Sequence, residues 1–141
     1  MCSTYNALEW VRHGLYQCLT KDEQLMGKVS GVFEEAPEGQ PFPYVTVDGI
    51  RSTSARTLSR PGEEVTATLR VWSDTAGFAE AIGILDDLNR LLADRELTGP
   101  EGGQVFCRYV ESEAGIDPDH PRRKVSVSYS LLVREPDQDS N

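Results

Sequence analysis

The sequence predicts an α+β fold of two layers, with two helices on one face of a mainly antiparallel sheet of about four to five strands. The main observation is the stretch 63–92, where a strand pattern changes directly into a helix pattern. In residues 65–71, apolar and polar side chains alternate, which is typical of a strand with one buried face. From residue 78 onward, apolar residues recur every three or four positions, as along one side of a helix: Phe78, Ile82, Leu85, Leu88 and Leu92.

This strand and this helix bury their apolar faces together if the helix folds back on the sheet. We expect the helix to run over about residues 75–93. Asp74 or Thr75 is its predicted N-cap, because either side chain can accept a hydrogen bond from the first turn. Three strand residues are expected to face three helix residues: Val65, Leu69 and Val71 on the strand, and Ile82, Leu85 and Leu92 on the helix.

A first helix is predicted at about residues 4–19, with Ser3 or Thr4 as its cap. Thr20 and Glu23 form a capping-box pattern for one further turn that Gly27 closes. The apolar stripe of the first helix consists of Leu8, Val11, Leu15, Cys18 and Leu19.

The remaining strands are predicted at residues 31–35, 44–50, 104–111 and 124–134. The inward side chains of the last two are Val105, Cys107 and Tyr109, and then Val125, Val127, Tyr129, Leu131 and Val133. The element order is therefore α-β-β-β-α-β-β, in a single domain over residues 1–134 with an acidic flexible tail at 135–141. Segments 51–62 and 112–121 show neither period and are predicted as loops.

Composition excludes several classes of protein. The formal net charge of −9 argues against general nucleic-acid affinity, which needs a basic surface. The first residues lack the basic start and apolar run of a signal peptide, and no apolar stretch is long enough to span a membrane. Cys2, Cys18 and Cys107 have no short spacing that indicates a disulfide framework or a zinc site. We expect a soluble protein from a reducing cytosol, without a membrane partner.

Candidate catalytic and ligand residues have simpler explanations as ordinary structural residues. His13 lies off the apolar stripe of the first helix and is expected to be solvated rather than a catalytic base. Asp86 and Asp87 diverge on the second helix and are expected on its wet face. Cys18 and Cys107 are expected to be core thiols.

Two glycine- and proline-rich turns contain further candidate residues. Asp117, Asp119 and His120 carry metal-ligand groups, but two prolines fit an ordinary turn better than a calcium loop. Gly102 and Gly103 belong to no phosphate-binding motif. We therefore predict no catalytic site, no cofactor and no metal, and no enzyme.

Three features give the chain a resemblance to a known family. The first is the N-terminal helix with its short second turn, LEWVRHGLYQCLTKDEQL, which leads into GKVSGVFEEAPEGQPFPYVTV. The second is PFPYVTV at residues 41–47, and the third is the strand-to-helix junction VTATLRVWSDTAGFAEA at residues 65–81. In this order they resemble the tail terminator proteins of long-tailed bacteriophages and gene transfer agents, also called tail completion or head–tail joining proteins.

The resemblance implies a structural virion protein in the tail or neck, assembled in the host cytoplasm. It implies a six-fold ring that caps the tail tube, stops its growth and joins the tail to the head connector. The implied partners are further copies of the chain, the tail tube protein and the head–tail connector or stopper protein, with genomic DNA only passing through the lumen. The alternatives are a neck or stopper protein, a non-viral α+β binding module, and an enzyme that uses one of the two loops.

The segment 51–62 suggests a contact for such a ring. It contains Arg51, Arg56 and Arg60 and no acidic residue, in a chain with 23 acidic side chains. We expect the loop to be mobile in the free subunit and hypothesise that these arginines grip carboxylates of a neighbouring subunit or an adjoining ring. A hairpin tip that only aids solubility and a contact with passing DNA are the alternatives.

Overall fold

The computed structural model describes residues 7–54, 62–98, 104–116 and 123–134, which form three helices and six strands. The helices are α1 (Ala7–Thr20), α2 (Glu23–Met26) and α3 (Ala79–Leu92). The strands are β1 (Val32–Phe33), β2 (Tyr44–Ser54), β3 (Gly62–Ser73), β4 (Arg95–Thr98), β5 (Gln104–Ile116) and β6 (Arg123–Arg134). None of these helices is long and apolar enough to cross a membrane.

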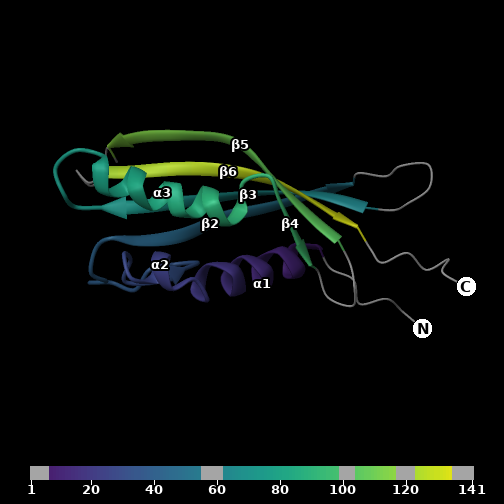
Figure 1. Cartoon of the computed structure of the whole chain (residues 1–141), viewed down its shortest axis with the longest axis horizontal. Helices are drawn as coiled ribbons and strands as arrows, with labels where there is room; N and C mark the ends of the chain where they lie inside the picture. Colours follow the sequence, from purple (N-terminus) through teal and green to yellow (C-terminus); the bar gives the residue numbers. More distant parts are fainter. Residues whose placement is uncertain (1–6, 55–61, 99–103, 117–122, 135–141) are drawn as a thin grey trace, which may run out of the picture.

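The strands form one curled sheet in the order β1-β2-β3-β6-β5-β4 (Figure 1). Only β1 and β2 are parallel, and all other neighbours are antiparallel. The sequence-based prediction of a mainly antiparallel sheet with α+β character is confirmed in class. The strand number was wrong, because β4 was missed, and the observed order of elements is α-α-β-β-β-α-β-β-β.

The core lies between the sheet and the helices. On β3, Val65, Ala67, Leu69 and Val71 are fully buried, and the five predicted inward residues of β6 are buried as well. Both α1 and α3 contact β3. In Figure 1, α3 lies in front of β3 and β6, and α1 runs beside it below. The predicted placement of these helices against the central strand is thus confirmed.

The predicted contact face of α3 was partly wrong. Leu85 and Leu92 are buried, whereas Ile82 is 43% exposed. Ala81 and Ile84 instead complete the buried arc with Leu88, because they lie on the same side of the helix as Leu85 and Leu92. The helical period alone could not show which edge of a wide apolar arc meets the sheet.

The beginning of α3 and the buried stripe of α1 also differ from the prediction, whereas the predicted start and cap of the first helix lie outside the described residues. α3 begins at Ala79 rather than near residue 75, and residues before it form a turn in which Gly77 has a φ of +80°. Neither Asp74 nor Thr75 caps it, and the Ser73 hydroxyl instead accepts from the Thr75 N–H at 3.2 Å. In α1, Leu8 of the predicted stripe is exposed.

The short helix α2 is capped by Asp22 rather than by Thr20. The Asp22 carboxylate accepts from the Leu25 N–H at 2.9 Å and from the Arg90 guanidinium at 2.7 Å. The hydrogen bond from Arg90 and then that from Leu25 lower the pKa of Asp22 below its ordinary value. This side chain ties α2 to α3.

Two predicted loops are partly strand. β2 continues to Ser54 and β5 to Ile116, so residues 51–54 and 112–116 are extended. Their small and charged side chains concealed this, because strand pairing here rests on backbone hydrogen bonds to β3 and β6. β-Bulges at Asp48 and at Val110 also interrupt the alternation that the sequence-based prediction used.

Candidate assembly surface

The middle of the sheet face that α1 and α3 do not cover carries mainly short polar side chains. β3 and β6 are neighbours, and Thr68 and Ser128 lie opposite each other with their hydroxyl oxygens 3.4 Å apart. One rung further, the Arg70 Nε donates to the Ser126 hydroxyl at 3.3 Å. Serine and threonine alternate with the buried residues in the middle of both strands, at Thr66 and Thr68 and at Ser126, Ser128 and Ser130, so the middle of this face is polar. We call it the polar sheet face.

The end of this face near β2 carries a bonded network. Arg70 forms an ion pair with Asp48 at 2.6 Å. The Thr46 hydroxyl donates to the Asp48 carboxylate at 2.6 Å and accepts from the Trp72 indole N–H at 3.0 Å. These contacts join β2 and β3 across the bulge and neutralise Asp48 locally.

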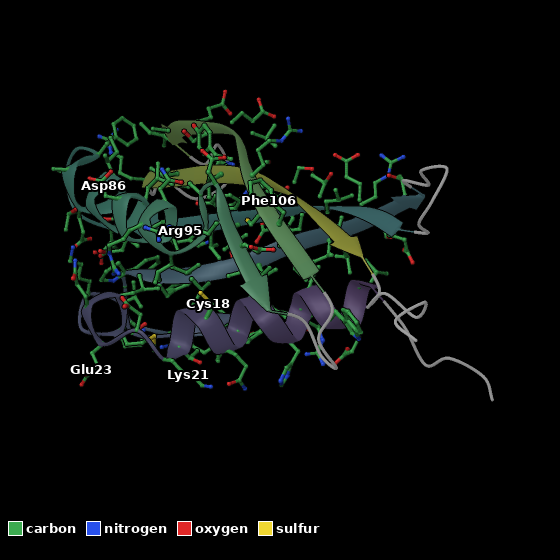
Figure 2. All side chains as sticks on the ribbon, turned by 45° about the vertical axis from the view of Figure 1, so that its right-hand side comes forward. Cys18, Lys21, Glu23, Asp86, Arg95 and Phe106 are labelled. Atoms are coloured by element: carbon green, nitrogen blue, oxygen red, sulfur yellow. The ribbon has the colours of Figure 1, made fainter. Side chains whose placement is uncertain are left out.

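β5 differs from the other strands in its exposed apolar side chains. Six large hydrophobic residues are exposed among the described residues, and four of them lie on β5. Their exposed fractions range from 37% to 52%, and Phe106 is labelled in Figure 2. The four are Phe106, Tyr109, Val110 and Ile116. Large apolar groups clustered on one exposed element indicate an interaction surface.

β5 and β2 also have backbone edges that no described strand covers. β4 pairs only with residues 104–107 of β5, which leaves residues 108–116 with a partner on one side alone. On the other side of the sheet, β1 pairs only with Val45 and Thr46 of β2. Residues 47–54 of β2 therefore pair with β3 alone. We call these two stretches the open edges.

The predicted arginine cluster is only partly described by the structure. Arg51 belongs to β2 rather than to a loop, which corrects the prediction for this residue. It lies opposite Thr66 on the polar sheet face, is exposed, and has no ion pair within the described ranges. Arg56 and Arg60 lie outside the described residues, so their proposed contacts stay a prediction.

Asp87 was wrongly predicted on the wet face of its helix. Its neighbour Asp86 is exposed as expected, but Asp87 is only 3% exposed. Its Oδ1 accepts from the Gln24 amide at 2.8 Å and from Arg90 at 3.4 Å. The Lys28 ammonium lies 2.8 Å from Oδ2 as an ion pair that lacks the alignment of a hydrogen bond. Asp87 thus fixes α2 and the following turn against α3, which is a structural role.

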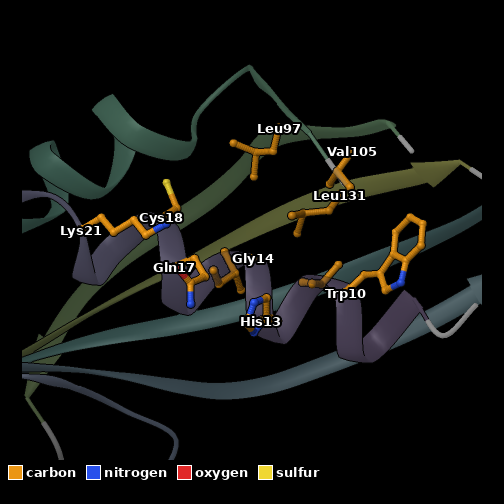
Figure 3. Close-up of a pocket in the computed structure, with 11 residues that line it drawn as sticks. Trp10, His13, Gly14, Gln17, Cys18, Lys21, Leu97, Val105 and Leu131 are labelled. Carbon is orange, nitrogen blue, oxygen red and sulfur yellow. The ribbon is translucent and has the colours of Figure 1, made fainter. Parts of the chain in front are cut away.

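A cavity of about 540 Å³ lies between α1 and the strands β4, β5 and β6 (Figure 3). Its lining is mainly apolar, with Leu97, Val105 and Leu131 opposite the helix. His13 is at its border and is exposed, which confirms the prediction of a solvated residue. Burial raises the pKa of the Cys18 thiol, which disfavours a reactive thiolate at this place.

The other predicted ligand and thiol residues give no site either. Burial raises the pKa of Cys107 to about 12, and the residue is fully buried, as predicted for a core thiol. Asp117, Asp119, His120 and Gly102–Gly103 lie outside the described residues. Within the part of the chain that the structure describes, no three His, Cys, Asp or Glu side chains gather as metal ligands would.

The sequence matches the tail completion protein gp17 family over residues 13–134, which is most of the chain. The chain belongs to this family. It is therefore a tail completion protein of the bacteriophage and gene transfer agent kind, a structural component of the virion tail. This confirms the resemblance stated from the sequence and leaves no support for a non-viral binding module.

A solved structure has the same fold as this family member. It is a chain in the virion of a native gene transfer agent (GTA) particle, with a TM-score of 0.81 and 20% sequence identity. The match covers 94% of this chain and 100% of that chain. A comparison with curated proteins gives no match.

Proposed function

We propose that this tail completion protein forms a ring, six-fold as in the family it resembles, that closes the growing end of the tail tube. The ring ends tube growth and presents a surface to the head–tail connector or stopper protein. The observation that carries the proposal is the family match over residues 13–134. Its partners are then further copies of itself, the tail tube protein and the connector, in a particle assembled in the host cytoplasm.

The chemistry of the surface supports an assembly protein. The described residues present a polar sheet face, an edge strand with exposed apolar side chains and two open edges, all of which suit contacts between proteins. The net charge of −9 suits a conduit for DNA, because like charge keeps phosphates from adhering to the wall. DNA is then a passing cargo rather than a bound ligand.

Inactivation of the gene tests this function. We expect a producing cell without the protein to make tails of variable and excessive length beside heads that carry no tail. Expression of the intact chain from a second copy of its gene should restore joined particles with one tail length. Electron microscopy of a lysate measures tail length and the joined fraction.

Two outcomes would contradict the proposal. Joined particles of normal tail length without the protein would remove it from tail completion. Tails of normal length beside unjoined heads would instead place the protein at the connector, as a stopper, and would exclude a role in ending tube growth.

A further inference from the structure

We propose that neighbouring copies of this chain join edge to edge, with residues 48–54 of β2 in one copy paired antiparallel to residues 110–116 of β5 in the next. This interface rests on the proposed function, since a ring requires contacts between copies. It adds which strands meet, in which register, and which charges face each other.

The two edges have the right directions for this pairing. β2 is antiparallel to β3, β3 to β6, and β6 to β5, so β2 and β5 run in opposite directions within one sheet. A second copy that continues the sheet beyond β5 therefore places its β2 antiparallel to β5. The contact joins two different edges of the same chain, and a heterologous contact of this kind generates a ring when the rotation closes.

The extents of the open edges and the positions of their β-bulges together select the register. β1 covers the start of β2, and β4 covers the start of β5, so the two open edges are staggered within the sheet. With Arg51 of one copy opposite Glu113 of the next, residues 48–54 pair with residues 110–116, which are seven of the eight residues of the β2 open edge. The β-bulges at Asp48 and Val110 then fall at the ends of the paired stretch, so its interior is regular.

In this register, the side chains that meet across the joint lie on the same face of the sheet, and the two charged ones have opposite sign. Arg51 lies on the polar sheet face opposite Thr66, and Glu113 lies on the same face opposite Ser126. Both are exposed, and the structure shows no ion pair for either one among the residues it describes. An arginine thus meets a carboxylate across the joint. On the other face, Ile50 meets Ala114.

The stagger also has the size that closure of a sheet requires. Without a stagger, Arg51 would lie level with Arg108, because the registers align Arg51, Thr66, Ser130 and Arg108. Moving it to Glu113 is a shift of four residues along β6, from Ser130 to Ser126. Each copy adds four strands to the continued sheet: β2, β3, β6 and β5. A shift of four residues at about 3.3 Å each, across four strands about 4.8 Å apart, corresponds to a strand tilt of about 35°, which is within the range of closed barrels.

The open edge of β5 suits pairing with a second copy of this chain better than contact with a flat apolar surface of another protein. An edge strand with a long unpaired backbone and exposed Tyr109, Val110 and Ile116 is a template for another strand. Its exposed acids, Glu111 and Glu113, match the basic charge that remains on the β2 edge once Arg70 has neutralised Asp48. The same chain therefore supplies both complementary edges.

A cysteine cross-link tests the register. Thr53 and Glu111 are both exposed and lie opposite each other in the proposed pairing, with Cα atoms about 4.5–5.5 Å apart, which suits a disulfide. A chain with Cys2→Ser, Thr53→Cys and Glu111→Cys should form a ladder of covalent oligomers on mild oxidation, in purified protein or in isolated particles. The matched control carries Ser112→Cys instead of Glu111→Cys, one residue away on the other face, and should give no ladder. Equal ladders from the Glu111→Cys and Ser112→Cys variants would overturn the proposal. So would the absence of a ladder from the Glu111→Cys variant in both purified protein and particles, or a cross-link from β5 only to a different protein.

A charge exchange gives a second, independent readout. Arg51→Glu alone or Glu113→Arg alone should weaken self-association by about tenfold, and the double variant should restore it to within about threefold. Glu96→Arg on β4 is the matched control and should leave association unchanged. Additive losses in the double variant would overturn the pairing. If the variants show no pairing between Arg51 and Glu113 while the intact chain still completes tails in the same cells, the interface is refuted and the proposed function stands.

Discussion

Replacing Leu88 by Ala is expected to lower the free energy of unfolding by about 2–5 kcal/mol. Leu88 is fully buried on α3 between the helix and the central strands, and α3 contacts both β3 and β6. Truncation removes apolar contacts and leaves a cavity that rigid strands on the other side cannot fill. Urea unfolding followed by circular dichroism measures the change.

Ile82→Ala on the same helix is the matched control for Leu88→Ala. Because Ile82 is 43% exposed, its truncation should cost less than about 1 kcal/mol. A larger loss for Ile82 than for Leu88 would mean that α3 faces the sheet in the phase that the sequence pattern suggested, and would refute the observed packing.

Replacing Asp87 by Ala is expected to cost about 2–3 kcal/mol. The substitution removes the acceptor for Gln24 and the counter-ion of Lys28 and Arg90. The loss stays below that of a fully buried pair, because the Lys28 and Arg90 side chains are 46% and 39% exposed and water can solvate them. The same unfolding experiment measures it.

Replacing the neighbouring Asp86 is the control that separates the effect of burial at Asp87 from the effect of net charge. Asp86→Ala changes the net charge by the same amount, but Asp86 is exposed, so its effect should stay within about 0.5 kcal/mol. Equal effects of the two substitutions would show that Asp87 acts only through net charge, and that its bonds to α2 contribute nothing.

The sequence predicted the parts of the fold in which one face is apolar and the other polar. Alternation identified β3 and β6, because each buries every second residue against the helices. It missed the second halves of β2 and β5, where small and charged residues on an open edge are held by backbone pairing. β4 was missed because four residues are too few to show a period.

Most of the candidate surface could not be predicted from the sequence. Arg51 was singled out for its lack of a local acid, yet it was placed in a loop, because Ser and Thr around it carry no strand signal. Which edges remain open depends on β6 inserting between β3 and β5, a long-range pairing that no local pattern encodes. Asp87 was missed for a related reason, since its partner Lys28 comes from a distant part of the chain.

The position of the protein in the particle tests the account most directly. A reconstruction of the tail by electron microscopy should show this chain as a ring of copies at the head-proximal end of the tube, in contact with the last tube ring on one side and the connector on the other. Density for the chain at the distal tip, inside the head, or as a single copy beside the tube would contradict the account.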